Sequence, residues 1–348
     1  LLPRIDSWQA RQCVQSLIDI ARKEHWFISE EEVQLQTKYL GEGSQGIVIA
    51  GEFSGSPVAV KTTKLEIEEI SSSQRAEEIH CLLTEVRVLR RVRHPNIVAW
   101  HGANMDPKSL SVSIIMERVQ GKNLQRVIQD EQVEMPDRFC AIVGISRALR
   151  YLHGRSPAII HGDLKASNVM AEKYPGHPRI LRTKLVDFGM SRVLSRRGRV
   201  SPLGGTPLWM APEVVLHRHQ RPGVAADVFS FGRVAFFVLT GLPPLVDCIV
   251  SAIVGMIEAR DVPPLPWPAN AEPQVLKCQP WVNACVEFEA GARTNMHMVG
   301  DFFEKEDPFR VEEGEESEEE EEEGDKYNIF HSTLRGSSFV EAEGVEEV

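Results

Sequence analysis

Hydrophobic positions near the start of the chain recur at steps of three and four residues. Within residues 5–24, Val14, Leu17, Ile18 and Ala21 fall on one face of a helix. This spacing is typical of a helix that packs one stripe of side chains against a core. We therefore predict an additional amphipathic helix ahead of the main fold.

Between Leu35 and Val119 the pattern changes to short runs rich in β-branched residues. These runs read GIVIAGEF, SPVAVK and VSIIMERV, and one helical segment around residues 74–92 interrupts them. Short runs of this composition are typical of strands. This part of the chain is predicted to form a small sheet with one helix.

From Leu124 onward the helical spacing returns. In RFCAIVGISRALRYLH the residues Ile142, Ile145, Leu149 and Leu152 recur at steps of three and four. We expect a second, mainly helical lobe to follow the sheet.

The longest apolar run, VAFFVLTGLPPLVDCIVSAIVGMI at residues 234–257, is interrupted by Gly241, Pro243, Pro244 and Asp247. A membrane-spanning helix needs about 20 consecutive apolar residues, so these interruptions argue against a span. A buried helix, a loop and a second helix are predicted instead.

The formal net charge of −11 is concentrated at one end of the chain. Residues 311–348 hold 15 acidic and 2 basic residues, while the rest of the chain is nearly neutral. Carboxylates at this density repel one another, so a disordered acidic tail is predicted. The nearly neutral remainder carries no basic surplus, which argues against nucleic acid as a main partner.

The remaining composition indicates a globular protein from a reducing compartment. A hydrophobic content of 42% allows a sizeable core. The six cysteines form no C-x-x-C pair, which disfavours a zinc site and favours unpaired thiols. We therefore expect a cytoplasmic location.

The segment LGEGSQGIV places three glycines between two strand-like runs. Gly41, Gly43 and Gly46 are in G-x-G-x-x-G register, and Val48 follows them. Small residues let backbone N–H groups approach phosphate oxygens, but an ordinary glycine-rich hairpin has the same spacing. This motif alone leaves both interpretations open.

The next strand, VAVK, ends in Lys61, which could emerge beneath the glycine loop. A lone lysine on a strand is usually a solvated edge residue. Glu85, in the helical segment LLTEVRVLRRV, offers it a partner. A lysine held by a glutamate can bind the α- and β-phosphates of ATP.

Two further segments carry the polar groups that phosphoryl transfer requires. In IIHGDLKASNVM, Asp163 could accept the hydrogen bond of a substrate hydroxyl, Lys165 could neutralise phosphate charge, and Asn168 could bind Mg²⁺. Asp187 in VDFGM adds a carboxylate ligand. One carboxylate and one amide beside the phosphates of ATP suit magnesium.

In this order, the motifs resemble those of eukaryotic protein kinases over roughly residues 26–305. The matching segments are GEGSQGIV, VAVK, Glu85, HGDLKASN, DFG, GTPLWMAPE and DVFSFG. The resemblance implies an α+β bilobal fold, with a β-rich N-lobe that carries one helix and a larger helical C-lobe. It divides the chain into an N-terminal helical extension at 1–25, the N-lobe at 26–119, the C-lobe at 120–309 and the tail at 310–348.

The resemblance also implies the sites for ATP and Mg²⁺. Met116 matches the gatekeeper, and Glu117 to Val119 match the hinge that bonds adenine. The implied cofactor-binding residues are Leu40, Gly41, Gly43, Ser44, Gly46, Val48, Ala59, Lys61, Met116, Glu117, Val119 and Met170. The implied catalytic residues are Lys61, Glu85, Asp163, Lys165, Asn168 and Asp187, of which Asn168 and Asp187 are the metal ligands.

Three supporting features follow from the same resemblance. Asp227 is expected to anchor the catalytic loop from a buried helix. Glu213 is expected to pair with Arg293 and to brace the second lobe. Leu89, His161 and Phe188 are expected to form part of an apolar spine between the lobes.

The motif residues also indicate a subgroup. Lys165 in DLKASN and Thr206 in GTPLWMAPE look like the serine/threonine type, and WFISEEEVQL and WMAPEV are similar to the tyrosine-kinase-like group. Gly162 departs from the family, whose members carry at this position an arginine that grips a phosphorylated activation loop. That arginine contacts neither ATP nor substrate, so its loss affects regulation and not the chemistry.

Three functions remain open on the sequence. The first is an ATP- and Mg²⁺-dependent kinase acting on serine or threonine of protein substrates. The second is a non-catalytic scaffold with a kinase fold. The third, a small-molecule phosphotransferase, is disfavoured by GTPLWMAPE, which resembles a peptide-docking shelf. A further hypothesis places the acidic tail against the basic activation segment SRVLSRRGRV.

Overall fold

The computed structural model describes most of the chain before residue 310. The described residues are 7–43, 46–62, 72–106, 109, 111–130, 132–174, 177–194, 207–216, 223–245, 248 and 250–309. Leu1–Pro308 forms one compact unit, and Phe309–Val348 forms another, of which the structure describes Phe309 alone. The predicted acidic tail therefore lies outside the described residues.

The predicted helix ahead of the main fold is present as α1 (Ser7–Lys23). Val14, Leu17, Ile18 and Ala21 are all buried, which confirms the predicted face. Burial of each larger aliphatic side chain contributes about 1.5 to 3 kcal/mol. This contribution fixes α1 against the sheet lobe, where Trp26 after the helix lies against Trp100 with ring centroids 5.3 Å apart.

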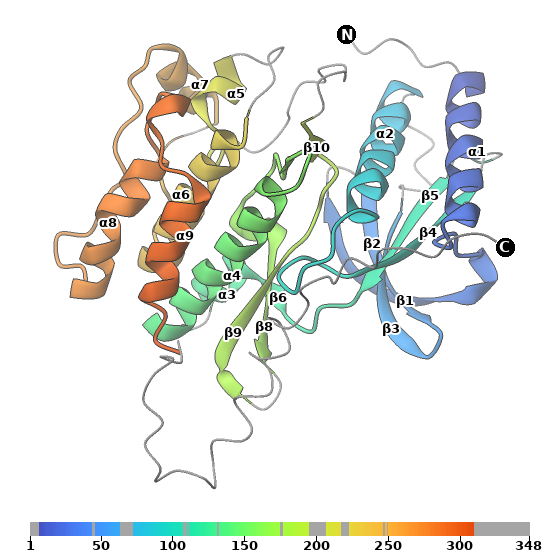
Figure 1. The fold of residues 1–348 in the computed structure, drawn as a ribbon, viewed down its shortest axis with the longest axis horizontal. Coiled ribbons are helices and arrows are strands. Elements are labelled where there is room, and N and C mark those ends of the chain that lie inside the picture. The colour runs from blue at the N-terminus through green and yellow to red at the C-terminus, as the bar shows by residue number, and fades with distance from the viewer. Residues whose placement is uncertain are drawn as a thin grey trace, which may run out of the picture. The chain divides into compact units, whose positions relative to one another are not determined.

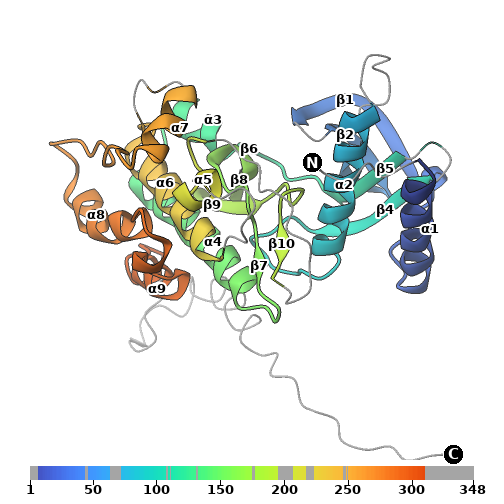
Figure 2. The same cartoon turned by 90° about the horizontal axis from the view of Figure 1, so that it is seen from above.

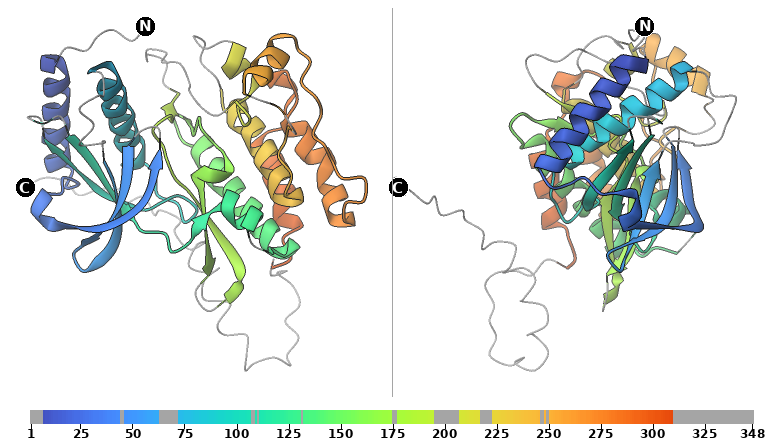
Figure 3. Two further views of the ribbon diagram at one scale, coloured as in Figure 1. Left: turned by 180° about the vertical axis from the view of Figure 1, so that it is seen from behind. Right: turned by 90° about the vertical axis from the view of Figure 1, so that its right-hand side faces the viewer.

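The sheet lobe contains five antiparallel strands and one long helix. The strands are β1 (Val33–Gly43), β2 (Gly46–Phe53), β3 (Ser56–Thr62), β4 (Trp100–Asp106) and β5 (Ser111–Glu117), in the spatial order β1-β2-β3-β5-β4. Helix α2 (Ser72–Leu89) crosses the sheet beside α1 (Figure 1 and Figure 3). The predicted small sheet with one helix is therefore confirmed.

The second lobe is mainly helical. Its helices are α3 (Leu124–Asp130), α4 (Met135–His153), α5 (Pro212–Leu216), α6 (Ala225–Thr240), α7 (Val250–Glu258), α8 (Pro273–Cys285) and α9 (Met296–Lys305). Ile142, Ile145, Leu149 and Leu152 of α4 are buried, as their spacing predicts. Figure 2 shows the sheet lobe and the helical lobe on either side of the segment that follows β5. This arrangement is the α+β bilobal fold that the sequence predicts.

Short strands lie where the two lobes meet. They are β6 (Lys122–Asn123), β8 (Val169–Tyr174) and β9 (His177–Leu185) in one sheet, and β7 (Ile159–Ile160) with β10 (Arg192–Val193) in another. Strands β8 and β9 form a hairpin in which Val169 pairs with Leu185. The hairpin places the residues just before β8 next to those just after β9.

The long apolar run folds as predicted into a buried helix, a loop and a second helix. Helix α6 ends at Gly241, whose φ of 74° is accessible to glycine without steric cost and whose N–H bonds the carbonyl of Phe237. Helix α7 follows the loop. Among the described residues, no helix has both the length and the apolar composition that crossing a membrane requires.

Candidate active site

Lys61 lies at the centre of a buried ion cluster. Strand β3 buries Val58 and Val60, and the ammonium of Lys61 lies 2.6 Å from Oε2 of Glu85 on α2 and 2.7 Å from Oδ1 of Asp187. The predicted pair of Lys61 and Glu85 is present. The contact with Asp187 additionally links the sheet lobe to the segment after β9.

The charges in this cluster stabilise one another. Burial alone would lower the pKa of Lys61, but the carboxylates of Glu85 and Asp187 outweigh burial and raise this pKa above its usual value. Burial would raise the pKa of Asp187, but Lys61 lowers it below the ordinary range. Burial raises the pKa of Glu85, and Lys61 opposes this effect. The ammonium is therefore charged at neutral pH, as phosphate binding requires.

Two backbone features hold the carboxylates of this cluster in place. The N–H of Phe188 donates to Oε1 of Glu85 at 3.2 Å, which ties α2 to the segment that carries Asp187. Asp187 itself adopts a left-handed backbone with a φ of 64°. The predicted spine is consistent with this geometry, because Leu89, His161 and Phe188 are buried and the rings of His161 and Phe188 lie 5.0 Å apart.

Asp163, Lys165 and Asn168 meet in the loop between β7 and β8. Nζ of Lys165 lies 2.8 Å from Oδ2 of Asp163. Nδ2 of Asn168 donates to the same oxygen at 3.0 Å and to the backbone carbonyl of Asp163 at 2.9 Å. These bonds fix the Asp163 carboxylate at the entrance of the loop, where its other oxygen can accept a proton.

Asp227 anchors this loop from α6. Its carboxylate accepts the N–H groups of His161 at 2.8 Å and Gly162 at 2.9 Å, and it lies 3.0 Å from Nε2 of His153. Burial alone would raise the pKa of Asp227, but these partners lower it below the ordinary range. The hydroxyl of buried Ser191 adds a bond to the carbonyl of His161. The predicted anchoring role of Asp227 is thus confirmed in its geometry.

Gly162 occupies a backbone conformation that suits glycine. Its φ is 80°, in the left-handed region that other residues enter at a cost. The N–H of Gly162 is also fixed by Asp227. Glycine therefore meets the local backbone requirement of the loop, while offering no guanidinium to the activation segment.

The two predicted metal ligands lie at the same end of the hairpin formed by β8 and β9. Asn168 immediately precedes β8, and the N–H of Val186, just before Asp187, donates to the carbonyl of Asn168 at 3.0 Å. Oδ1 of Asn168 and Oδ2 of Asp187 make no hydrogen bond with the residues that the structure describes. Two open oxygens, one amide and one carboxylate, fit Mg²⁺ that also binds ATP phosphates.

The predicted adenine site is lined from both lobes. Strand register places Val48 beside Lys61 and Ala59 beside Met116. Val48 and Ala59, and Met170 of β8, keep partial exposure among buried neighbours. Leu40 and Gly41 lie in β1, where Gly41 pairs with Val48, and Gly43 pairs with Gly46 where β1 meets β2. Ser44 lies outside the described residues.

The hinge segment presents its backbone to this site. The side chain of Glu117 already has partners within the chain. Its Oε1 accepts the N–H of Ala99 at 2.7 Å and lies 2.6 Å from Nζ of Lys184. Neither the N–H nor the C=O of Val119 is hydrogen-bonded to a residue that the structure describes. Adenine carries both donors and acceptors on its edge, so this free backbone suits it.

Behind the catalytic loop, the segment Pro207–Leu216 is held by buried arginines. Arg293 makes a bidentate pair with Glu213 at 2.7 and 2.8 Å, as predicted. Arg233 of α6 donates to the carbonyl of Leu208 at 2.6 Å and stacks on Phe229, 4.6 Å from the ring centroid. Burial lowers the pKa of Arg233 to about 10, so this side chain stays charged at neutral pH.

Sequence reasoning missed two of these residues, Lys184 and Arg233. Lys184 is buried and holds the first residue of the hinge, and Arg233 holds the carbonyl of Leu208. Arg233 could have been noticed as a cation inside the apolar run FGRVAFF, and Lys184 as a cation directly before the apolar residues Leu185 and Val186. Charged residues in such runs are usually paired when they are buried.

Comparison with known proteins agrees with this geometry. The model of the protein kinase domain matches residues 35–299. The chain is 34% identical over 244 residues to the serine/threonine-protein kinase CTR1 of Arabidopsis thaliana, covering 68% of this chain and 27% of that protein. It is 30% identical over 267 residues to a putative serine/threonine-protein kinase/receptor, R831, of Acanthamoeba polyphaga mimivirus, covering 76% and 15%.

A third relative is the human mitogen-activated protein kinase kinase kinase 13, which is 29% identical over 282 residues, covering 80% of this chain and 26% of that protein. The chain thus spans about a quarter or less of the length of these relatives. The predicted similarity to serine/threonine kinases of the tyrosine-kinase-like group is confirmed. With its motifs, its bilobal fold and a domain match over most of its length, the chain belongs to the protein kinase family.

Proposed function

We propose that this chain is an ATP- and Mg²⁺-dependent protein kinase that phosphorylates serine or threonine hydroxyls of protein substrates. The observation that carries the proposal is the position of Lys61 between Glu85 and Asp187, at 2.6 and 2.7 Å. A lysine held in this way carries a fixed positive charge for the α- and β-phosphates of ATP. The preference for serine and threonine is supported by Lys165, by Thr206 and by the names of the relatives.

In this mechanism, the backbone of the glycine loop covers the phosphates and Val119 bonds adenine. Asn168 and Asp187 would hold Mg²⁺ through Oδ1 and the free carboxylate oxygen. When bound, Mg²⁺ neutralises charge that develops on the phosphate oxygens. The remaining steps depend on Asp163 and Lys165.

Asp163 receives the hydrogen bond of the substrate hydroxyl and orients its oxygen toward the γ-phosphorus. A new oxygen–phosphorus bond forms while the bond between the γ-phosphorus and the bridging oxygen of ADP breaks. The hydroxyl proton passes to Asp163, and ADP leaves with the electron pair. Lys165, 2.8 Å from Asp163, offsets negative charge on the transferred group.

A non-catalytic scaffold is the alternative function. A scaffold of this kind would have the same fold, and a match to the family does not distinguish it from an active kinase. The proposal of catalysis is favoured because each polar group of the transfer chemistry is present and because Lys61, Glu85 and Asp187 are in contact. A small-molecule substrate is disfavoured by the shelf at Pro207–Leu216, which Arg233 holds through the carbonyl of Leu208 and Arg293 holds through Glu213.

The substrate and the location are further parts of this proposal. A protein substrate fits the shelf. A cytoplasmic location fits cysteines that form no disulfide among the residues that the structure describes. We also retain the hypothesis that the acidic tail contacts the activation segment and lowers activity. The basis is opposite charge, because the activation segment carries four arginines, Arg192, Arg196, Arg197 and Arg199. Replacing Glu318 to Glu323 by glutamine in the full chain should then raise activity at low salt, and moderate salt should abolish the difference.

The deciding experiment for catalysis is incubation of the full chain with labelled ATP, Mg²⁺ and a mixed peptide library. Labelled phosphoserine or phosphothreonine should appear, and the variant Asp163→Asn should bind ATP normally without transferring phosphate. If neither the chain nor any peptide acquires label while ATP binds, the scaffold function is correct.

A further inference from the structure

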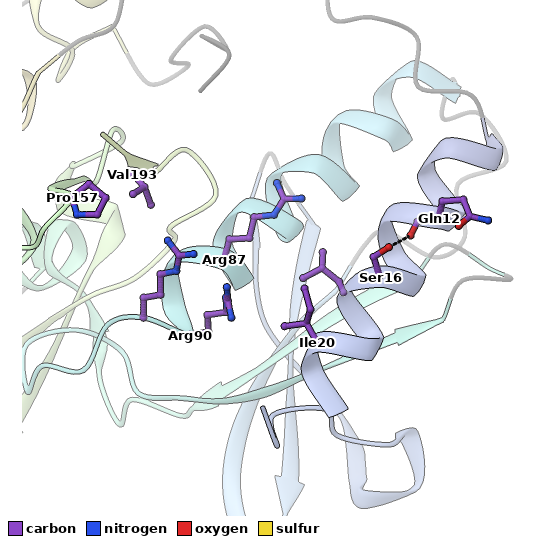
Figure 4. A pocket seen from close by; sticks show the side chains of 9 residues that line it. Gln12, Ser16, Ile20, Arg87, Arg90, Pro157 and Val193 are labelled. Carbon is purple, nitrogen blue, oxygen red and sulfur yellow. Dashed lines mark hydrogen bonds between the residues drawn. The ribbon is translucent and has the colours of Figure 1, made fainter. Parts of the chain in front are cut away.

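A pocket of about 700 Å³ lies on the sheet lobe, away from the predicted nucleotide site. Figure 4 shows Gln12, Ser16 and Ile20 of α1 on one side, Arg87 and Arg90 at the end of α2 next to them, and Pro157 and Val193 on the far side. Leu17 and Arg91 also line the pocket. The pocket therefore joins α1, the helix that carries Glu85, and the start of the activation segment.

The three arginines are only partly neutralised. Arg90 pairs with Glu24, yet its Nε is buried and has no hydrogen-bond partner among the described residues. Arg87 and Arg91 are exposed and make no ion pair with any residue that the structure describes. Cations at the end of α2 complement the helix dipole, but this effect leaves their hydrogen-bond donors free for a ligand.

The α1 wall of the pocket carries an apolar surface, formed by Leu17 and Ile20, beside the polar residues Gln12 and Ser16. Leu17 is buried, whereas Ile20 retains 40% exposure on a helix whose neighbouring face is packed. A small anion would contact the guanidinium groups and leave this wall in water. A ligand that carries carboxylates next to an aliphatic side chain would use both surfaces, because guanidinium groups form paired hydrogen bonds with carboxylates.

We propose that this pocket binds an acidic peptide segment of a partner protein. Its carboxylates bond Arg87 and Arg91, and an adjacent aliphatic side chain packs against Leu17 and Ile20. The contact between Glu24 and Arg90 is an example, within the chain, of a carboxylate bound by one of these arginines.

Occupancy of the pocket has a consequence for the active site. Arg87 follows Glu85 by two residues on α2, so a ligand that fixes this end of α2 favours the position in which Glu85 contacts Lys61. Binding of the acidic segment should therefore raise kinase activity. This consequence rests on the proposed function, whereas binding itself does not.

Binding is tested with the full chain carrying Asp163→Asn, so that the result does not depend on catalysis. The probe is a fluorescein-labelled peptide of six glutamates followed by two leucines, and its dissociation constant is measured by anisotropy at low salt. The double variant Arg87→Gln with Arg91→Gln should weaken binding at least about tenfold. Ile20→Ser should weaken it about threefold, and a peptide with glutamines in place of glutamates should not bind.

The matched control is Arg126→Gln with Lys305→Gln, which removes the same charge from exposed positions outside the pocket. Equal weakening by the two double variants would mean non-specific attraction and would overturn the proposal. Thermal melting of each variant verifies that it is folded. If replacing Glu318 to Glu323 by glutamine tightened binding about tenfold, the occupant would be the chain's own tail, and the partner segment would be wrong.

The regulatory part is tested on the chain with Asp163 intact. Saturating peptide should raise kcat/KM about threefold, and the variant with Arg87→Gln and Arg91→Gln should lose this response. Binding without any change in kcat/KM of an active kinase would overturn the coupling to Glu85. A chain that binds peptide but transfers no phosphate under any condition would count against the proposed function alone.

Discussion

Helix α2 borders two groups of positive charge with opposite properties: the ammonium of Lys61 on β3, which contacts Glu85 of α2, and the arginines at the end of α2. Lys61, 6% exposed, contacts two carboxylates, whereas Arg87 and Arg91 are exposed and make no ion pair among the described residues. A buried charge without a partner is destabilised by several kcal/mol, so the first group must be paired within the chain. Water stabilises the second group at little cost, which leaves it open to an external ligand.

The largest expected effect comes from breaking the buried cluster at Asp187. Asp187→Asn keeps the side-chain shape but removes the charge that faces Lys61 and the predicted metal. We expect phosphate transfer to fall on the order of a thousandfold, measured as kcat/KM with a peptide substrate. Asp261→Asn, at an exposed position, is the control. Near-normal turnover of Asp187→Asn would refute its assignment as a metal ligand.

Glu85→Gln should have the next largest effect. The amide still accepts the N–H of Phe188, and Asp187 still neutralises Lys61, so melting should change little. Lys61 loses one of its two anchors, and a misplaced phosphate contact should lower kcat/KM about tenfold to a hundredfold. Glu258→Gln on α7 is a control at an exposed position. Equal activity of the two variants would remove Glu85 from the catalytic set.

A pH titration tests His94, a half-buried side chain whose neutral form is favoured in the folded chain. Burial, with Arg147 nearby, lowers the pKa of His94 to about 4, and its Nδ1 accepts the N–H of Asn96 at 3.1 Å. Above pH 6.5, His94 is neutral in both the folded and the unfolded chain. Between about pH 6.5 and 4 only the unfolded chain takes up the proton, so the free energy of unfolding falls, by about 2 kcal/mol after allowance for partial exposure.

The measurement is chemical denaturation of the chain and of His94→Gln at several pH values. The variant should lose this part of the pH dependence while keeping the dependence due to other groups. Parallel curves for the two proteins between pH 6.5 and 4 would show that His94 titrates alike in both states.

Glu24→Gln should have the smallest effect on kinase activity, and it tests the arginines at the end of α2. The pair of Glu24 and Arg90 is partly exposed, and such pairs contribute little to stability. Basal kcat/KM should therefore change less than about twofold. Because the variant frees Arg90, the glutamate peptide should bind more tightly, and weaker binding would mean that Glu24 helps to form the pocket. Glu258→Gln again serves as the control.

The positions of the candidate catalytic residues could be predicted because each lies in a short segment whose neighbours are informative. Lys61 lies near the end of an alternating strand. Asp163 and Asn168 share one loop, so their spacing in the sequence already implied that they are close together. Glu85 was proposed as the partner of Lys61 from its place in the helical segment, and the family resemblance supported the pair, because no local rule connects residues on a strand and on a helix. The helix at 7–23 and the break near Gly241 followed from periodicity and from the need for a helix end.

The rest depended on orientation that the sequence does not contain. Lys184 and Arg233 were visible as charged residues next to apolar ones, but their partners are the side chain of Glu117 and the carbonyl of Leu208 in a distant segment. The cluster of Arg87, Arg90 and Arg91 looks like an ordinary basic helix end until α1 is placed beside it. Gly162 was recognised as a departure, but its φ of 80° required the structure.

The contact between Asp187 and Lys61 also stabilises the backbone conformation of Asp187. A left-handed conformation at a residue other than glycine costs roughly 1 to 2 kcal/mol, and this cost is lowest for residues such as aspartate. In this chain Oδ1 of Asp187 is held by Lys61 and by the N–H of Gly189. These two bonds stabilise the left-handed backbone conformation of Asp187. Loss of the Lys61 ammonium would remove one of the bonds that hold Asp187 in this unfavourable conformation. The segment after β9 would then relax, and the orientation of the Asp187 carboxylate would be lost together with the phosphate contact.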